Sequence, residues 1–293
     1  MRRLSFHEEI EKNKKKSWLL TFLVFSFLLM TFYMISLFFD YTQRIGIIIV
    51  GFIFTISYIL LNWFYGDKII LSSLGAKEAK EQKYLQLNNV VEELSIAAGI
   101  PKPKVYVIES PEMNAFAIGR KPKDSSIAIT TGLLEKLNRD ELSGVIGHEI
   151  AHISNYDVRF SFLVATLVGL VVFLSDIFLR NLKDSGHHKN KGSLLIVIGL
   201  VFALLAPIFV RLVQFAISRK REFLADATSA KLTRYPEGLA SALEKIMRHN
   251  KGQMFVSEAI SHLFFVDPNK THVDYLFSTH PPIEERIRIL RSM

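Results

Sequence analysis

The sequence predicts a mostly α-helical integral membrane protein with a small β-sheet and about four transmembrane helices. Hydrophobic residues make up 49% of the 293 residues, and the mean hydropathy is +0.25. A soluble domain of this size usually contains less apolar material. Two runs, Trp18 to Phe39 and Ile45 to Tyr65, contain no charged side chain. Each matches the ~20 residues that span the hydrocarbon core of a bilayer.

The residues before the first apolar run are strongly basic and account for much of the net charge of +8. By the positive-inside rule they hold the amino terminus in the cytoplasm, so the second helix returns there after a tight outer turn from Asp40 to Arg44. The first run is long and rich in Phe, which favours an anchor over a cleaved secretory signal. No nucleic-acid partner is expected, because no platform of aromatic and basic side chains accompanies the charge. The basic residues are Arg2, Arg3, Lys12, Lys14, Lys15 and Lys16.

Two later apolar stretches, Phe160 to Ser175 and Gly192 to Val210, are predicted to form a second transmembrane hairpin. Both are uncharged, but the first is short and the second contains Pro207 near its end. The connecting loop, Asp176 to Lys191, is more basic than the positive-inside rule favours for an external loop. An alternative is a hairpin that crosses the bilayer only in part, and either arrangement leaves both of its ends on the cytoplasmic side.

Between the two apolar pairs the pattern changes to that of a folded domain. Apolar positions recur at helical spacing from Lys77 to Ala98, where Gly99 and Pro101 supply a stop. Short runs rich in Val and Ile then predict a small β-sheet. The predicted strands are Lys104 to Ile108, Ala115 to Gly119 and Ser126 to Thr131.

Another helix is predicted from Asp140, with Asn138 and Glu141 forming a capping box at its start. Its pattern continues toward the third apolar stretch, so the helix is expected to run into that stretch. The tail from Pro236 to Met293 is predicted to form further helices, and the last of them begins after Pro282.

The predicted helix carries His148 and His152, with Glu149 directly after the first histidine. Residues four apart share one helix face, so both imidazoles can bind one zinc ion while Glu149 activates a water molecule. Because the chain contains no cysteine, a metal must use nitrogen and oxygen ligands. The alternative is a helix surface with two solvated histidines.

A zinc site of this class needs a third protein ligand, for which Glu222 is the candidate. Asp226 lies one turn later on the same helix face and is placed to accept a hydrogen bond from a ligand histidine. The alternative is an ordinary exposed pair of acidic residues. An antiparallel hairpin of the third and fourth apolar stretches favours the ligand, because it brings His148, His152 and Glu222 to a similar depth on one side.

Taken together, these segments resemble the HtpX-type family of bacterial membrane zinc proteases, heat-shock-linked relatives of the CAAX prenyl endopeptidases. The resemblance covers most of the chain and is densest from Tyr84 onward. It implies a gluzincin-type metalloprotease domain. The segments that carry it are Met113 to Ala117, Thr130 to Leu134, His148 to His152, Glu222 to Asp226 and Thr279 to Pro282.

The resemblance also implies a role for each site residue. One Zn²⁺ per chain would be held by His148, His152 and Glu222, and Glu149 would be the general base. Asp226 would support one of the two ligand histidines from behind.

A substrate peptide would pair in extended form with an edge strand, a mode that recognises backbone more than side chains. Ile118 stands where the family commonly has Thr, and a strand that recognises backbone tolerates this change. His280 would stabilise the oxyanion. Without the family, a histidine before two prolines indicates a turn and a helix start. The strand consists of Asn114, Ala115, Phe116 and Ala117.

Membrane and cytoplasmic segments are expected to alternate along the chain. The protein is expected in the cytoplasmic membrane of a bacterium, with its active site facing the cytoplasm. The expected units are an amino-terminal basic segment and transmembrane hairpin (1–66), a cytoplasmic protease domain with the zinc helix (67–159), a second transmembrane hairpin (160–210), and the continued protease domain with the third ligand and carboxy-terminal helices (211–293).

The predicted function is a zinc-dependent endopeptidase that hydrolyses misfolded or surplus membrane proteins, a substrate class that comes from the resemblance. Its partners are then the lipid bilayer and unfolded protein substrates, while the sequence does not predict an oligomeric state. One alternative is a processing protease of the CAAX type, which has more membrane helices in that family. Another is a catalytically silent metal-binding scaffold, which would not need Glu149. A transporter is disfavoured, because the motif lies outside the apolar segments.

Overall fold

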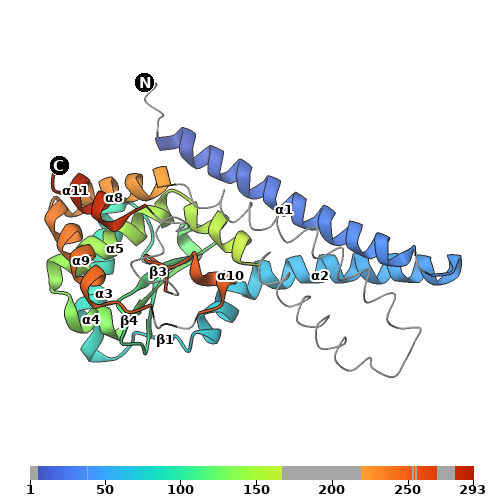
Figure 1. Cartoon of the computed structure of the whole chain (residues 1–293), viewed down its shortest axis with the longest axis horizontal. Helices are drawn as coiled ribbons and strands as arrows, with labels where there is room; N and C mark the ends of the chain where they lie inside the picture. Colours follow the sequence, from blue (N-terminus) through green and yellow to red (C-terminus); the bar gives the residue numbers. More distant parts are fainter. Residues whose placement is uncertain (1–5, 38, 167–218, 253, 255, 269–280) are drawn as a thin grey trace.

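The computed structural model describes residues 6–37, 39–166, 219–252, 254, 256–268 and 281–293. Two long helices, α1 (Phe6–Ser36) and α2 (Tyr41–Ser73), lie antiparallel and extend away from a domain that combines helices with a small sheet (Figure 1). The prediction of a mostly helical protein with a small sheet is confirmed.

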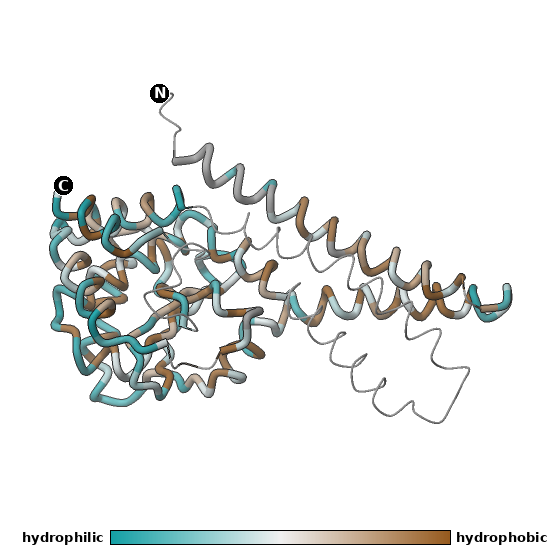
Figure 2. Tube along the Cα trace, viewed as in Figure 1, coloured by the Kyte–Doolittle hydropathy of each residue, from teal (hydrophilic) through white to brown (hydrophobic). Residues whose placement is uncertain are grey.

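The two projecting helices carry a continuous band of hydrophobic residues (Figure 2). In the described part of the chain, Ser17–Ser36 and Tyr41–Ser73 are long and apolar enough to cross a membrane. Only 24% of the first apolar window and 11% of the second is buried inside the protein. The core helix of a soluble protein would be mostly buried, so these side chains need lipid to cover them.

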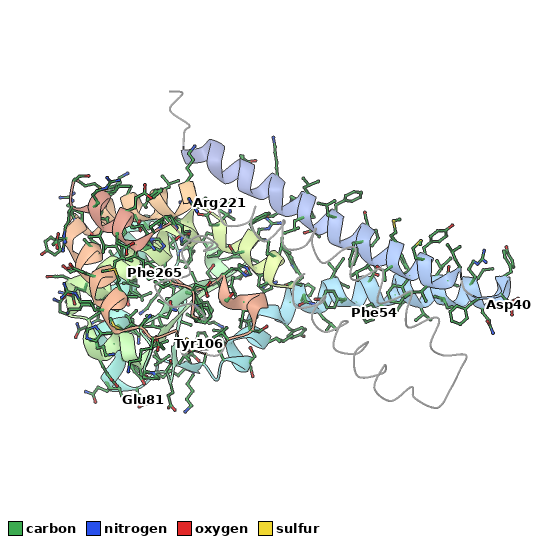
Figure 3. All side chains as sticks on the ribbon, viewed as in Figure 1. Asp40, Phe54, Glu81, Tyr106, Arg221 and Phe265 are labelled. Atoms are coloured by element: carbon green, nitrogen blue, oxygen red, sulfur yellow. The ribbon has the colours of Figure 1, made fainter. Side chains whose placement is uncertain are left out.

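Asp40 lies at the far tip of the pair (Figure 3) and is the N-cap of α2. The predicted outer turn from Asp40 to Arg44 is wrong, because α2 already begins at Tyr41 and the Arg44 N–H donates to the Asp40 carbonyl at 2.8 Å. The connection lies earlier than expected, between the end of α1 at Ser36 and the start of α2 at Tyr41.

Of the third apolar stretch, Phe160 to Ser175, the structure describes residues 160–166, which are helical. This helix, residues 157–166, packs against α2: a Cβ at Gly66 would lie 2.6 Å from the ring of Phe162. Farther along, the Tyr58 hydroxyl donates to the Thr166 carbonyl at 2.7 Å. The two helices therefore run antiparallel. The fourth stretch, Gly192 to Val210, lies outside the described residues.

The sheet has four strands in the order β1-β2-β4-β3. β2 and β4 are parallel, and the other two pairs are antiparallel. The three predicted strands are confirmed to within one residue at their ends, and β3 is the edge strand on one side. The strands are β1 (Lys77–Glu78), β2 (Lys104–Ile108), β3 (Ala115–Gly119) and β4 (Ser125–Thr130).

The predicted helix from Lys77 to Ala98 is wrong in its first part, because α3 spans Leu85–Ala98 only. Lys77 and Glu78 instead form β1, which pairs with β2. A strand of two exposed residues has no alternating pattern to indicate it. The predicted stop is confirmed, because Gly99 adopts φ 68° and caps α3.

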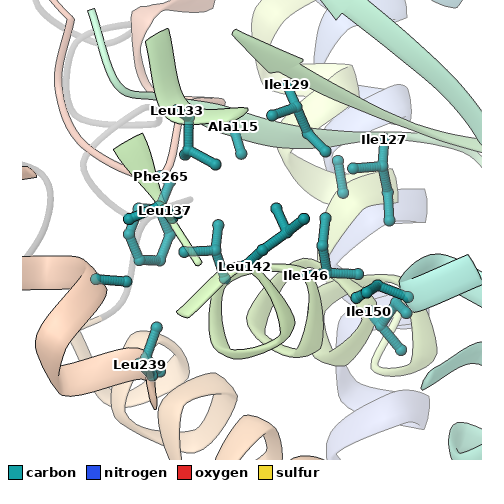
Figure 4. Packing of buried hydrophobic residues seen from close by; sticks show 14 of the residues in the cluster. Ala115, Ile127, Ile129, Leu133, Leu137, Leu142, Ile146, Ile150, Leu239 and Phe265 are labelled. Carbon is teal, nitrogen blue, oxygen red and sulfur yellow. The ribbon is translucent and has the colours of Figure 1, made fainter. Parts of the chain in front are cut away.

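The core lies between the sheet and α5 (Arg139–Ser154), as Figure 4 shows. α5 begins at the predicted capping box, in which Asn138 and Glu141 bond each other's backbone. α8 (Arg219–Thr233) and α9 (Pro236–His249) pack against α5 as well. The facing side chains include Ala115, Ile127 and Ile129 from the sheet, and Leu142, Ile146 and Ile150 from α5.

α5 does not continue into the third apolar stretch as predicted. It ends at Ser154, Tyr156 adopts φ 60°, and a new helix starts at Asp157. Neither Gly nor Pro marks this break, which is why the helical pattern concealed it. In the described residues, three further α-helices are short: α4 (Thr131–Lys136), α10 (Glu258–Ser261) and α11 (Ile283–Leu290), the last of which begins after Pro282 as predicted.

Gly144 allows α5 and α9 to touch, because a Cβ there would lie 2.6 Å from the Leu239 backbone nitrogen. We expect Gly144→Ala to lower stability by about 1–3 kcal/mol, since a backbone cannot yield as a side chain can. The measurement is the thermal unfolding midpoint of the protein in detergent. Gly46→Ala is the matched control, because a Cβ at Gly46 meets nothing within 4 Å. Equal midpoints for both variants would contradict the close contact.

Candidate active site

Three side chains converge where α5 meets α8: His148, His152 and Glu222. Their ligand atoms all lie within 4.8 Å of one another. The two histidine Nε2 atoms are 3.0 Å apart, and the Glu222 oxygens lie 3.6 Å from Nε2 of His148 and 3.5 Å from Nε2 of His152. Ligands bound to zinc at ~2.0–2.1 Å in a tetrahedron are about 3.3 Å apart. The donor set and its spacing therefore fit this metal.

Small residues bring the two helices close enough for this convergence. A Cβ at Gly147 would lie 2.7 Å from the Ser229 hydroxyl oxygen. That hydroxyl donates to the Gly144 carbonyl of α5 at 2.6 Å. Because α8 approaches the backbone of α5 here, Glu222, two turns earlier on α8, reaches the histidines.

The outer nitrogen of each histidine is held by a carboxylate. His148 Nδ1 lies 2.9 Å from Asp226 Oδ1, and His152 Nδ1 lies 3.2 Å from Asp157 Oδ2. A carboxylate there keeps the proton on Nδ1 and leaves the Nε2 lone pair for a metal. Asp226 thus contacts His148. Asp157 was not predicted, because it comes after the unforeseen break at the end of α5.

The charges of the cluster favour a bound cation. Burial by itself would lower the pKa of His152, but the hydrogen bond to Asp157 and the charges of Glu222 and Glu149 outweigh it and raise the pKa to about 9. These carboxylates therefore stabilise a positive charge at this place. A divalent cation satisfies the same carboxylates.

Glu149 points into the site from α5 and is only 2% exposed. Burial raises its pKa above the usual value, although the charges of His148 and His152 oppose this shift. The Ala117 N–H of β3 donates a hydrogen bond to its carboxylate. A buried carboxylate with a raised pKa is a stronger base than one in water, which suits proton transfer near neutral pH.

Arg286 of α11 completes the buried network, and sequence reasoning missed it. Its Nε and Nη2 donate to Asp226 Oδ2 and Oδ1 at 2.9 and 2.7 Å. Burial would raise the pKa of Asp226, but the charge of Arg286 and the His148 hydrogen bond hold it below the usual value. A signal was present: Arg286 shares one helix face with buried Ile283, Ile287 and Leu290.

A pocket opens beside the cluster, and aromatic residues cover one side of it. Phe265 packs edge-on against His148 at 4.8 Å between ring centroids, and the Arg286 guanidinium lies 4.7 Å from the Phe265 ring centre. Arg221 and Phe265, both visible in Figure 3, line this pocket. His262 also lines it, with Nε2 3.2 Å from the Ser161 carbonyl. Its place in the pocket was not predicted.

The predicted substrate strand forms β3 next to the site. The Asn114 side chain donates to the Val266 carbonyl at 2.7 Å, and the Phe265 N–H donates to the Ala115 carbonyl at 2.7 Å. The chain's own residues 265–266 therefore already contact the start of this edge. His280 lies outside the described residues.

Residues 81–293 match the model of peptidase family M48. The protease HtpX homologue of Dictyoglomus turgidum is 45% identical over 299 residues, which cover 100% of this chain and 96% of the relative. The protease HtpX homologue of Streptococcus gordonii is 37% identical over 98% of this chain and 99% of its own length.

The chain belongs to peptidase family M48. Its relatives place it in the HtpX group, and it is a membrane protease whose described residues include two helices apolar and long enough to cross a membrane. The crystal structure of S. mikatae Ste24p shares the fold of this M48 peptidase, with a TM-score of 0.51 and 22% identity. The match covers 97% of this chain and 66% of that one. The sequence-based recognition of the family is confirmed.

Removing the carboxylate behind His152 tests the metal cluster. We expect Asp157→Asn to weaken Zn²⁺ binding about 10- to 100-fold, because the His152 ring is no longer held in one orientation and tautomer by a carboxylate. Competition with a fluorescent chelator measures the affinity. Asp140→Asn, an exposed change in the first turn of α5, is the control. An unchanged affinity in Asp157→Asn would show that this carboxylate does not support the site.

Removing Arg286 tests the buried network. We expect Arg286→Ala to destabilise the fold by about 3–5 kcal/mol, because Asp226 is left as a buried charge without its partner. Urea unfolding in detergent measures the change. Arg288→Ala alters an exposed residue of the same helix and should stay within about 0.5 kcal/mol of the parent. Similar losses in both variants would contradict the role of the ion pair.

Proposed function

We propose that this M48 peptidase is a zinc-dependent endopeptidase with one Zn²⁺ held by His148, His152 and Glu222. The observation that carries the proposal is the convergence of two Nε2 atoms and a carboxylate, with the outer histidine nitrogens held by Asp226 and Asp157. Two imidazoles and one carboxylate are a donor set that suits zinc and leaves a coordination position open.

When bound, zinc acts as a Lewis acid that polarises a peptide carbonyl and lowers the pKa of a nearby water molecule. Glu149 accepts a proton from the attacking water and later gives it to the leaving amine. Its burial excludes bulk water, so the proton is exchanged with the reacting groups. His148 and His152 keep their orientation through the reaction, because Asp226 and Asp157 hold their Nδ1 atoms.

The substrate peptide lies extended along the outer edge of β3 and pairs with the backbone of Asn114, Ala115, Phe116 and Ala117. Ala117 is the part of the edge nearest the chemistry, since its N–H already contacts Glu149. The Ala115 carbonyl is engaged by Phe265, so pairing at that end requires the peptide to replace this contact. We retain His280 as the residue that stabilises the oxyanion.

The site faces the cytoplasm, and the chain crosses a bacterial cytoplasmic membrane four times. Support comes from the position of the folded domain at the same end of the α1–α2 pair as the lysine-rich beginning of α1. The division into residues 1–66, 67–159, 160–210 and 211–293 follows from this topology. Helix 157–166, which packs along α2, is the start of the third crossing.

The substrates are misfolded or surplus membrane proteins. Asp157 supports His152 and is also the first residue of the helix that runs along α2, so the catalytic cluster lies close to the membrane boundary. A peptide leaving the bilayer would meet the edge of β3 at short range. A catalytically silent scaffold is the alternative, and the following experiment separates the two.

We expect Glu149→Gln to retain one equivalent of zinc and to lose proteolysis, because the amide keeps the shape of the side chain but cannot take a proton. His148→Ala should lose both, since a ligand is missing. The measurements are zinc content by atomic absorption and casein cleavage by the protein purified in detergent.

The controls distinguish loss of the catalytic base from loss of the folded structure. Glu149→Gln should unfold at the same temperature as the unchanged chain. Casein cleavage that persists in a purified Glu149→Gln variant would argue against the assigned base. Zinc retained in His148→Ala at full occupancy would rule out the proposed ligand set.

A further inference from the structure

Three helices meet at one arginine where the membrane pair joins the domain. The guanidinium carbon of Arg159 lies over the ring of Trp18 of α1, 5.5 Å from its centroid, and over the ring of Trp63 of α2, 5.4 Å from its centroid. Arg159 itself belongs to helix 157–166, next to the active-site helix α5. The arginine thus touches every helix that leads toward the bilayer in the described part of the chain.

Arg159 has no anionic partner among the described residues. It is 7% exposed, and its Nε is buried without a hydrogen-bond acceptor. Removing this charge from water is costly. Two aromatic faces offset part of this cost. A buried guanidinium usually has a carboxylate or phosphate partner as well.

A second guanidinium flanks the same tryptophan. Arg120 lies 5.7 Å from the Trp63 ring centroid, and its Nη1 donates to the Trp63 carbonyl at 2.6 Å. Its Nε is also buried without an acceptor. Within the described residues, neither arginine forms an ion pair with an acidic side chain. The cluster therefore carries two positive charges around one indole ring.

The position of these side chains relative to the bilayer indicates which anion could bind them. Trp18 is the first residue of the first apolar run, Trp63 lies near the end of the second, and Arg159 directly precedes the third. Contacts between Gly66 and Phe162 hold these helices side by side. Tryptophan and arginine at the ends of membrane helices lie at the level of the lipid headgroups. The anion that is abundant at this level is the phosphate of a phospholipid.

We propose that Arg159 and Arg120, with Trp18 and Trp63, form a binding site for the phosphate group of an anionic phospholipid. The phosphodiester oxygens accept from the guanidinium nitrogens, and the two indole rings cover the glycerol region. Because two positive charges face no acidic side chain, a headgroup with net negative charge is preferred to a zwitterionic one. The lipid would fix the depth of the domain at the membrane, since Arg159 lies two residues after Asp157.

The composition of the chain provides a direct probe, because Trp18 and Trp63 are its two tryptophans. Intrinsic tryptophan emission therefore reports on this cluster. The full chain in detergent is titrated with phosphatidylglycerol, with phosphatidylcholine and with inorganic phosphate. We expect a saturable change with phosphatidylglycerol, a half-saturation about tenfold higher for phosphatidylcholine, and no change with inorganic phosphate at equal concentration.

Variants test the assigned residues. Arg159→Gln should raise the half-saturation for phosphatidylglycerol at least about tenfold, and Arg120→Gln should raise it by a smaller factor. Arg139→Gln removes an exposed arginine that pairs with Glu93 far from the cluster, and it should leave the titration unchanged. If Arg159→Gln does not fold, Arg159→Lys is the alternative. It keeps the positive charge but lacks the planar guanidinium, so it should bind phosphatidylglycerol with intermediate affinity.

The outcomes are distinguishable. An equal response to phosphatidylglycerol and phosphatidylcholine would overturn the preference for an anionic lipid. A response to inorganic phosphate that matches phosphatidylglycerol would assign the site to free phosphate instead. Unchanged titrations in both Arg159→Gln and Arg120→Gln would remove the site altogether. None of these results depends on whether the chain is active as a protease.

Discussion

The buried ion pair between Asp226 and Arg286 joins three parts of the chain that are distant in sequence. Arg286 comes from α11, Asp226 from α8, and the second contact of Asp226 is His148 on α5. Buried pairs are often less stabilising than a well-packed apolar contact of the same volume, because two charges must leave water. This pair also fixes the tautomer and the orientation of His148. The candidate metal site of His148, His152 and Glu222 depends on that orientation.

A second constraint comes from the lipid-facing helices. The side chains of α1 and α2 are too exposed and too apolar for water, so the fold is complete only in a membrane. Helix 157–166 connects the membrane helices to the active site. It carries Asp157, which contacts His152, and it packs against α2 through Phe162. The position of the bilayer and the geometry of the cluster are therefore linked through one short helix.

Local patterns predicted much of the fold. The strands β2, β3 and β4 and the capping box of α5 all depend on residues near one another in sequence, and they are confirmed. The errors occurred where such signals were weak. Lys77 and Glu78 form a strand only because β2 offers a partner, and the break at Tyr156 has neither Gly nor Pro. The turn between α1 and α2 ends at Asp40, earlier than the polar residues after it indicated.

The sequence by itself determined the two long apolar helices, the family and the candidate ligands His148, His152 and Glu222, because apolar runs and short motifs are signals that can be recognised along the chain. Only the tertiary structure decided that Asp226 contacts His148, that Asp157 contacts His152 and that Arg286 pairs with Asp226. It alone also placed Arg159 between two tryptophans. These contacts join elements far apart along the chain, and packing rather than local periodicity sets which side chains meet.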